Sequence, residues 1–284
     1  GLPLDLYLAP DRVLPVMGSR GCYWEKCAFC SIPFDHMEFH VRYAENVVND
    51  FKTLQEKYNC NHFFFTDEAL PINFLRTFAA KIIEEKVDVQ WTGELKFEKS
   101  LLKDDRMDLL SKSGCRKLIF GLESYNQRVL DSMKKGVELS WVDDTVERCI
   151  KLGIAMHFYL ICGFPTETRE EVMDSVNFVL NNQRLLDSPG FSAILSQFDL
   201  ERGAPIEKNP AEWGLKNLYT PSEHDLSLGY SYETTIGMNS KEINDLYQEL
   251  IEKLGREVMT FPHNYSLSDG LLYLAHHQRN SLTE

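Results

Sequence analysis

The sequence lacks any apolar run long enough to span a membrane, and its first residues, GLPLDLYLAPDR, lack the basic and apolar regions of a secretion signal. It also lacks basic runs. Its net charge is −13 at pH 7, whereas proteins that track phosphate backbones normally present a basic face. We therefore disfavour membrane and nucleic-acid partners, and RNA modification would require a basic surface from another domain.

A regular disulfide framework is also missing. The seven cysteines are an odd number in a chain too long to need disulfide staples, and four of them are scattered. This usage favours a reducing compartment, so we expect a cytoplasmic protein. Because the first residue is Gly1 and not Met, we expect a processed or shortened amino-terminal end with room for a preceding domain.

The other three cysteines, Cys22, Cys27 and Cys30, fall within nine residues in the stretch GCYWEKCAFCS. Three thiolates suit a 4Fe-4S cluster, because each iron needs one outer ligand and the fourth iron then stays open. With His36 or His40 the same cysteines would make a Cys3His zinc site. A zinc-stabilised binding module without redox chemistry is therefore the alternative.

Strand-like and helix-like segments alternate along the chain. The strands read as continuous apolar runs, which is typical of a parallel sheet covered by helices. Six β-α units in succession predict either an open doubly wound sheet or a curved, barrel-like one. The predicted strands are 13–17, 62–66, 89–95, 117–123, 155–164 and 191–200, and the predicted helices include 44–58, 75–82, 101–112, 140–152 and 241–253.

Capping signals predict where two of the helices begin. Ser140 with Asp143, and Thr168 with Glu171, have the spacing of a capping box, in which each side chain bonds to the other residue's backbone N–H. Gly153 predicts the end of the first of these two helices, because glycine readily adopts the left-handed conformation of a helix terminus.

Polar and small residues follow the predicted strands, just past their carboxyl ends. In a parallel sheet or barrel these ends meet at one rim, where ligands bind. A single site built from five loops is the economical interpretation, although Asp67 could instead cap the next helix. The residues at the rim are the cysteine loop, Thr66–Glu68, Glu94 with Lys96, Gly121–Ser124 and Gly163–Pro165.

Taken in order, these segments resemble the radical S-adenosyl-L-methionine (SAM) superfamily from about Val13 to Leu200. Each motif alone is weak, and their order and placement at strand ends make the resemblance specific. The motifs are the cysteine loop with Phe29 before the last cysteine, FFFTDE, IFGLESYNQRVLDSMKKG and YLICGFPTET.

The resemblance implies an α/β fold: a partial six-stranded parallel (β/α)6 barrel with a mainly helical C-terminal extension. Residues 1–12 would be an N-terminal extension, residues 13–207 the barrel, and residues 208–284 the extension that covers the substrate side. It also implies an enzyme that binds a 4Fe-4S cluster and cleaves SAM reductively. Such an enzyme would methylate, or abstract hydrogen from, a peptide or small molecule, with electrons from a donor such as flavodoxin or ferredoxin.

The resemblance also carries roles to particular positions, although none is identified as catalytic. It implies that Cys22, Cys27 and Cys30 bind the cluster, that Phe29 lies near the adenine, and that Thr66, Asp67 and Glu68 meet the SAM ammonium group. It further implies that Lys96 faces the SAM carboxylate, that Glu123 and Ser124 hold the ribose, and that the backbone of Cys162, Gly163 and Phe164 meets the adenine.

Two positions depart from the commonest family pattern. Four residues, not three, separate Cys22 from Cys27, so the loop must bulge. Lys96 stands where arginine is more usual and offers a point charge in place of a bidentate fork. The flanking segments LDLYLAPDRVLPVMGSRGCYW and LERGAPIEKNPAEWGL resemble the cobalamin-associated branch. The sequence has no Asp-x-His-x-x-Gly stretch, so cobalamin would be bound by a domain outside this chain.

Overall fold

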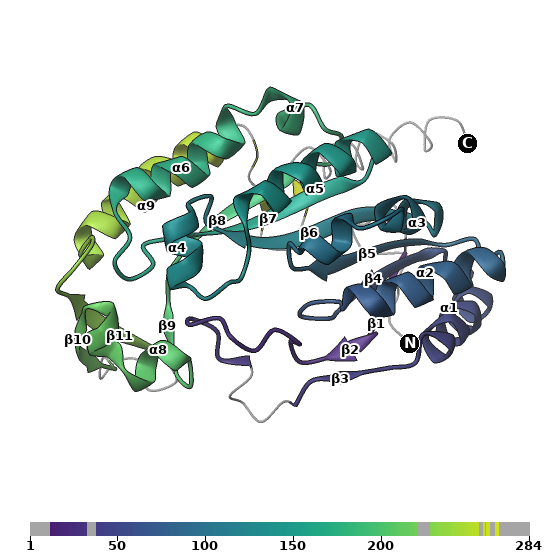
Figure 1. Cartoon of the computed structure of the whole chain (residues 1–284), viewed down its shortest axis with the longest axis horizontal. Coiled ribbons are helices and arrows are strands. Elements are labelled where there is room, and N and C mark those ends of the chain that lie inside the picture. The colour runs from purple at the N-terminus through teal and green to yellow at the C-terminus, as the bar shows by residue number, and fades with distance from the viewer. Residues whose placement is uncertain are drawn as a thin grey trace, which may run out of the picture.

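A computed structural model describes residues 12–32, 38–220, 228–255, 258, 260–261 and 265–266 of the chain. Its centre is a sheet of six parallel strands in the order β1-β4-β5-β6-β7-β8 (Figure 1). Among these residues β1 and β8 do not pair with each other, so the sheet is an open, partial barrel, and the predicted fold class is confirmed. The strands are β1 (Val13–Val16), β4 (His62–Phe65), β5 (Gln90–Leu95), β6 (Cys115–Glu123), β7 (Ala155–Cys162) and β8 (Ser192–Gln197).

Helices cover one face of this sheet. Each buries an apolar stripe against the strands, as α1 does with Val47, Val48 and Phe51. The predicted capping box of Thr168 and Glu171 is present at the start of α6, and α5 ends at Gly153 with a φ of 65°. The helices between the strands are α1 (Ala44–Tyr58), α2 (Ile72–Glu84), η3 (Lys99–Leu102), α3 (Arg106–Lys112), α4 (Gln127–Ser132), α5 (Leu139–Leu152), α6 (Arg169–Leu180) and α7 (Gln183–Leu186).

Two local predictions were wrong. The predicted helix 101–112 is divided into η3 and α3, because Lys103 is extended and Asp104 has a φ of 54°, in the left-handed region that aspartate tolerates. Helix α5 starts at Leu139, with Glu138 as its N-cap and no side-chain cap. Ser140 therefore lies inside the first turn, where it cannot form the predicted capping box.

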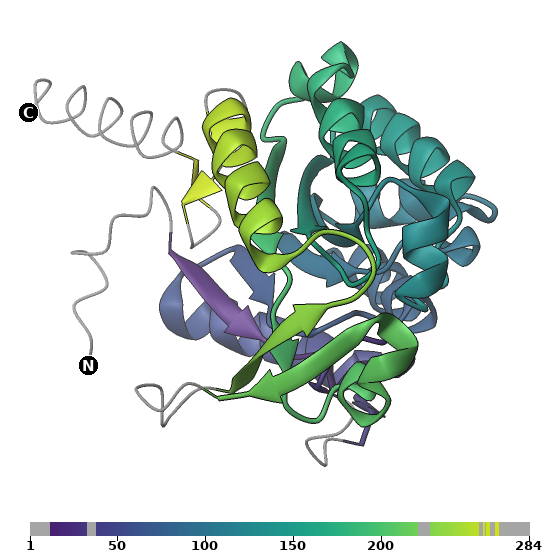
Figure 2. The same ribbon diagram turned by 90° about the vertical axis from the view of Figure 1, so that its left-hand side faces the viewer.

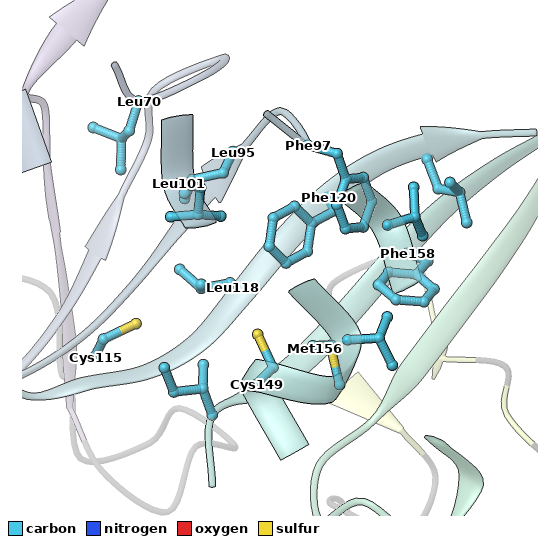
Figure 3. Packing of buried hydrophobic residues seen from close by; sticks show 14 of the residues in the cluster. Leu70, Leu95, Phe97, Leu101, Cys115, Leu118, Phe120, Cys149, Met156 and Phe158 are labelled. Carbon is cyan, nitrogen blue, oxygen red and sulfur yellow. The ribbon is translucent and has the colours of Figure 1, made fainter. Parts of the chain in front are cut away.

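The core lies between the sheet and these helices. Figure 3 shows Leu118 and Phe120 of β6 beside Met156 and Phe158 of β7, all completely buried. The rings of Phe97 and Phe120 stack with their centroids 4.2 Å apart. Burying one such ring stabilises the fold by about 2–3 kcal/mol. A shift in the pairing of the strands would expose these rings, so their packing also fixes the strand register.

A smaller unit follows β8 at the carboxyl end of the sheet. It lies at the left of Figure 1, and Figure 2 shows β10 and β11 in front of the curved sheet. The long helix α9 buries Ile243, Leu246 and Leu250 in the main core. The unit has three antiparallel strands in the order β10-β11-β9. Its elements are β9 (Leu200–Glu201), α8 (Pro205–Lys208), η4 (Pro210–Trp213), β10 (Leu215–Tyr219), β11 (Gly229–Thr234) and α9 (Ser240–Gly255).

Two short hairpins lie outside these sheets, β2 (Ser19–Arg20) with β3 (His40–Val41), and β12 (Thr260–Phe261) with β13 (Tyr265–Ser266). Of the predicted N-terminal extension, only Arg12 is among the described residues. No helix in the described part of the chain combines the length and the apolar character needed to cross a membrane.

Candidate active site

The cysteine loop follows β2. Its three cysteines are all partly exposed, and the backbone N–H of Cys30 donates to the carbonyl of Cys27 at 3.4 Å, which closes a turn between these two residues. Glu25, one of the four residues between Cys22 and Cys27, has a φ of 53°. This left-handed residue gives the loop the bend that the additional residue requires.

The middle of the loop is anchored on both sides. Ala28 is completely buried, its N–H donates to the carbonyl of Met133 at 2.8 Å, and its carbonyl accepts from the N–H of Ile206 at 3.0 Å. Ala28 belongs to a second apolar cluster that joins the loop to α4, to Phe164 and to the segment after β8. The loop is therefore held by elements far apart in the sequence, since buried backbone groups need partners.

Trp24 fastens the loop to residues 134–136. Its Nε1–H donates to the carbonyl of Lys134 at 2.9 Å, and Lys96 Nζ lies 4.0 Å from the centroid of its ring. The same ammonium group donates to the carbonyl of Gly136 at 2.7 Å. Burial lowers the pKa of Lys96 to about 8. Lys96, predicted to face the SAM carboxylate, thus contacts the loop and its support.

Gly136 gives a test of this contact. A Cβ there would lie 2.1 Å from the Trp24 ring, and its φ is 60°. Gly153 has a φ of 65° and nothing within 4 Å of such a Cβ, so it is the matched control. We expect Gly153→Ala to cost about 1 kcal/mol of unfolding free energy from backbone strain, and Gly136→Ala about 2 kcal/mol more from overpacking. Urea unfolding measures both, and equal losses would contradict the tight Trp24 contact.

A buried ion pair lies beside the loop. Lys135 Nζ is 2.6 Å from Glu123 Oε1, and the two side chains are only 12% and 10% exposed. A Cβ on Gly121 would lie 2.4 Å from this carboxylate oxygen and 2.7 Å from the ammonium nitrogen. The pair therefore rests directly on the backbone of β6, at a position that only glycine allows. Lys135 Nζ is also 5.7 Å from the centroid of the Phe29 ring.

Lys135 received no role from the sequence, although it lies in the recognised stretch IFGLESYNQRVLDSMKKG. A signal was present, because the carboxylate of Glu123 follows the apolar run LIFGL and a buried carboxylate needs a cation. The sequence offered two adjacent lysines, however, and only the fold distinguishes the exposed Lys134 from the paired Lys135.

Glu94 and Glu68 contribute further carboxylates to the same rim. Burial first, and then the charge of Glu68, raise the pKa of Glu94 to about 7. The Tyr159 hydroxyl donates to Glu94 Oε1 at 3.4 Å. Glu68 is exposed, and its pKa is raised by partial burial and by Asp67. Thr66 is also exposed, so Thr66 and Glu68 are accessible to a ligand at the rim.

Asp67 has a different position from its two neighbours. It is 3% exposed and accepts hydrogen bonds from the Gly18 N–H at 2.9 Å, the Ser19 hydroxyl at 2.6 Å and the Ser19 N–H. It does not cap α2, whose N-cap is Pro71. Asp67 instead fixes the turn from which the cysteine loop starts.

Ser124 also points away from Glu123. It is completely buried, its hydroxyl lies 3.3 Å from the hydroxyl of Ser175 on α6, and it accepts from the N–H of Asn126 at 3.2 Å. The structure thus brings together Glu123, Lys135, Phe29 and the cysteines, and places Ser124 between β6 and α6.

The loop after β7 is closed by Glu167. One carboxylate oxygen, Oε2, accepts from the N–H groups of Gly163 and Phe164 at 2.8 and 3.2 Å. Cys162 is buried in the main core, and the ring of Phe164 packs edge-on against Phe198. Part of the backbone predicted to meet the adenine, the N–H groups of Gly163 and Phe164, therefore bonds to Glu167, a residue that sequence reasoning missed.

Glu167 also predicts a pH effect on stability. It is 1% exposed, and burial raises its pKa to about 8 from 4.5. Between these values the folded protein binds more protons than the unfolded chain, so stability falls as the pH rises from 5 to 8, by at most about 1.4 kcal/mol per pH unit. We expect Glu167→Gln to remove this part of the slope in urea unfolding. Glu170→Gln, at an exposed position, is the control, and an unchanged slope in Glu167→Gln would contradict the prediction.

The donor set at the loop fits a cluster better than a single metal ion. No three His, Cys, Asp or Glu side chains of the described residues stand where they could hold one metal ion. His40 lies 3.7 Å from Glu38, and His36 is outside the described residues. The zinc alternative therefore has no support here. Thiolates of a 4Fe-4S cluster each bind a different iron and need not converge on one point.

The charges around the loop also favour this fit. Burial raises the pKa of Cys27, and it raises that of Cys30 to about 12. The positive charge of Lys135 acts in the opposite direction on both thiols, because a nearby cation favours the thiolate. Three thiols from one anchored loop beside a buried ammonium group form a suitable ligand set for an anionic cluster.

A family model described as the Radical SAM superfamily matches residues 16–179 of the chain. The chain is 30% identical to an uncharacterized methyltransferase, PH0819, of Pyrococcus horikoshii, over 62% of this chain and 39% of that protein. It is 26% identical to bacteriochlorophyllide d C-12(1)-methyltransferase of Chlorobaculum tepidum, over 65% of this chain and 40% of that protein. The chain thus spans about two fifths of the length of these relatives.

Solved structures share the fold. The radical SAM methyltransferase TsrM from Kitasatospora setae, with cobalamin and a [4Fe-4S] cluster bound, has a TM-score of 0.65 at 17% identity, over 88% of this chain and 55% of that one. The cobalamin-dependent SAM radical enzyme OxsB, with aqua-cobalamin and SAM bound, has a TM-score of 0.64 at 13% identity, over 94% of this chain and 46% of that one.

Proposed function

The chain belongs to the radical SAM superfamily of enzymes, and on that premise we propose that it is a methyltransferase that holds a 4Fe-4S cluster through Cys22, Cys27 and Cys30. The observation that carries the proposal is the anchored cysteine loop beside the buried Glu123–Lys135 pair, at the carboxyl end of the sheet. When bound, the cluster and SAM supply one-electron reduction and a transferable methyl group or carbon radical.

The protein's own residues would position SAM by charge. Lys135 is the cation that we assign to the SAM carboxylate, because its ammonium group lies 5.7 Å from the centroid of the Phe29 ring and acts on the thiols of Cys27 and Cys30. Lys96 contacts Trp24 and Gly136. Glu123 holds Lys135 in place and keeps a second carboxylate oxygen as an acceptor for ribose hydroxyls. Glu68, exposed and without a described ion pair, is the acceptor for the SAM ammonium group. Phe29 provides an apolar face for the adenine.

Apolar packing would shield the site from water. The second apolar cluster joins Ala28 of the cysteine loop to Phe164, Phe198 and Leu200, which would exclude water from this side of the loop. We assign residues 13–207 to the catalytic barrel and the segment from 208 onward to the cover of the substrate side, which β10 and β11 would form while α9 packs in the main core. Excluding water strengthens the electrostatic contacts of a bound cofactor and protects reactive species.

The substrate and partners belong to the same proposal. The methyltransferase names of the relatives support methyl transfer to a small molecule or peptide, and the similarity to two cobalamin-bound structures supports cobalamin held by a domain outside these residues. A one-electron donor such as flavodoxin or ferredoxin would reduce the cluster. The cysteine usage favours the cytoplasm, where such a cluster stays reduced.

The test is anaerobic reconstitution of the unaltered protein with iron and sulfide, followed by addition of dithionite and SAM. We expect an iron–sulfur absorbance spectrum and the release of 5′-deoxyadenosine or S-adenosylhomocysteine, with neither product when the reductant is omitted. A colourless protein that retains zinc and leaves SAM intact would overturn the proposal.

A further inference from the structure

The inner face of the sheet, defined as the side opposite the helices, carries several polar side chains, whereas the outer face is apolar. Strand residues alternate between the two faces. The outer positions Leu118, Phe120, Met156 and Phe158 form the core in Figure 3. Among the inner positions are Thr92 and Glu94 of β5, Lys117 and Ile119 of β6, His157 and Tyr159 of β7, and Ser192 and Ile194 of β8.

Three inner-face residues form a continuous track. The Tyr159 hydroxyl donates to Glu94 Oε1 at 3.4 Å, which crosses from β7 to β5. The rings of His157 and Tyr159 meet edge-on with their centroids 4.8 Å apart. Glu94 lies at the rim end of the track, beside the Glu123–Lys135 pair, and His157 lies deeper in the barrel. We call Glu94, Tyr159 and His157 the inner-face track.

The deep end of the track has an unused polar atom. His157 is 1% exposed, and its Nδ1 is 2.8 Å from the hydroxyl of Ser192. Its Nε2, at the other edge of the ring, is buried and has no hydrogen-bond partner among the described residues. Burial lowers the pKa of His157 to about 3, so the ring is neutral and Nε2 can accept or donate according to tautomer. An unsatisfied buried polar group is costly, and a polar ligand would satisfy it.

The rim end has an unpaired negative charge. Within the described residues, Glu94 has no ion pair, whereas the nearby Lys135 is bound to Glu123. Burial and the charge of Glu68 raise the pKa of Glu94 to about 7, and the positive charge of Lys135 offsets them only in part. Among the described residues, Lys117 also lies on this face. It is two positions earlier on β6 than Ile119, the register partner of Glu94, and its Nζ is 3.3 Å from the hydroxyl of Ser192.

We propose that the inner-face track binds the substrate of the reaction, and that Glu94 receives a cationic nitrogen of that substrate, such as a protonated amine or amidine. This assignment rests on the proposed function, in which Glu68 takes the ammonium group of SAM. Tyr159 orients the Glu94 carboxylate, and His157 bonds to a polar group of the substrate farther into the barrel. The chemistry recognised is therefore a cation at the rim joined to a polar group about two strand positions deeper.

The same cation chemistry could come from SAM itself, so the experiment separates the two sources. Saturation-transfer NMR measures the binding of benzylammonium, benzyl alcohol and benzoate to the reconstituted protein, with and without SAM. We expect benzylammonium to bind at least about tenfold more tightly than benzyl alcohol, and Glu94→Gln to abolish this preference. Tyr159→Phe should reduce it about threefold. Glu84→Gln, at an exposed position on α2, is the matched control.

Equilibrium dialysis then measures SAM affinity in the same variants. A change of less than about threefold in Glu94→Gln, compared with a loss of at least about tenfold in Glu68→Gln, supports the assignment of Glu94 to the substrate. A tenfold loss of SAM affinity in Glu94→Gln would overturn it, and so would an ammonium preference that survives this substitution. If the unaltered protein binds no SAM, the proposed function is wrong. The preference for benzylammonium measured without SAM still tests the role of Glu94 in that case. Unfolding midpoints confirm that each variant is folded.

Discussion

Replacement of Cys27 with alanine is expected to leave the protein folded but without its cluster, and to reduce reductive SAM cleavage at least about a thousandfold. Cys27 forms a turn with Cys30, and its thiol lies within the electrostatic influence of Lys135 and Glu123. Because each cysteine serves a different iron, two remaining thiols leave two irons without protein ligands. Iron and sulfide content and the yield of 5′-deoxyadenosine after reconstitution measure the effect.

A matched control separates the loss of a cluster ligand from the loss of any cysteine side chain. Cys149 is completely buried on α5 and belongs to the main core. Cys149→Ala should retain full iron content and lose only about 1 kcal/mol of unfolding free energy through the small cavity. A Cys27→Ala protein that binds as much iron as Cys149→Ala would contradict the assignment of the cysteine loop as the cluster site.

The second large effect is expected for Lys135→Met, which should weaken SAM binding about a hundredfold while the cluster still assembles. The ammonium group of Lys135 is held 2.6 Å from Glu123 Oε1 in a largely buried pair. Its removal eliminates the cation proposed for the SAM carboxylate and leaves Glu123 buried without a partner. That second consequence costs about 3–5 kcal/mol of unfolding free energy. Equilibrium dialysis with SAM on the reconstituted protein measures the binding.

Three further variants interpret that result. Lys134→Met removes the adjacent, exposed lysine and should leave SAM affinity unchanged, because the carbonyl of Lys134 still accepts from Trp24. Lys135→Arg keeps the charge and should retain much of the affinity. In Lys135→Met with Glu123→Gln the buried charge is gone, so stability should recover while SAM binding does not. Normal SAM affinity in that double variant would assign Lys135 a purely structural role.

These variants test Lys135 and not Lys96, because the two lysines have different partners in the structure. Lys96 follows β5 directly, so its place along the sequence suggested a ligand contact, yet its ammonium group is bonded to Gly136 and lies over Trp24. Lys135 follows α4 and pairs with Glu123 at the same rim. Trp24, one of the four residues between the first two cysteines, thus contacts the cation that the resemblance assigned to the SAM carboxylate.

The sequence alone determined the positions of the strands and of several helix ends, because these depend on local patterns of residues. Apolar runs predicted all six strands of the sheet, because the outer positions of these strands are buried beneath the helices. Thr168 with Glu171, and Gly153, marked helix ends because capping bonds and a positive φ involve only neighbouring residues. The spacing of the cysteines and the order of the motifs at strand ends indicated the family.

The tertiary structure alone decided which side chains meet at the rim. Asp67 and Ser124 stand beside predicted ligand residues in the sequence, but their hydrogen bonds go to the β1–β2 turn and to α6. Lys135 and Glu167 gained their roles from partners and burial that appear only once distant segments pack. Local patterns fix the course of each strand and helix, whereas the destination of a polar side chain depends on which buried group, often a hundred residues away, needs its charge or hydrogen bond.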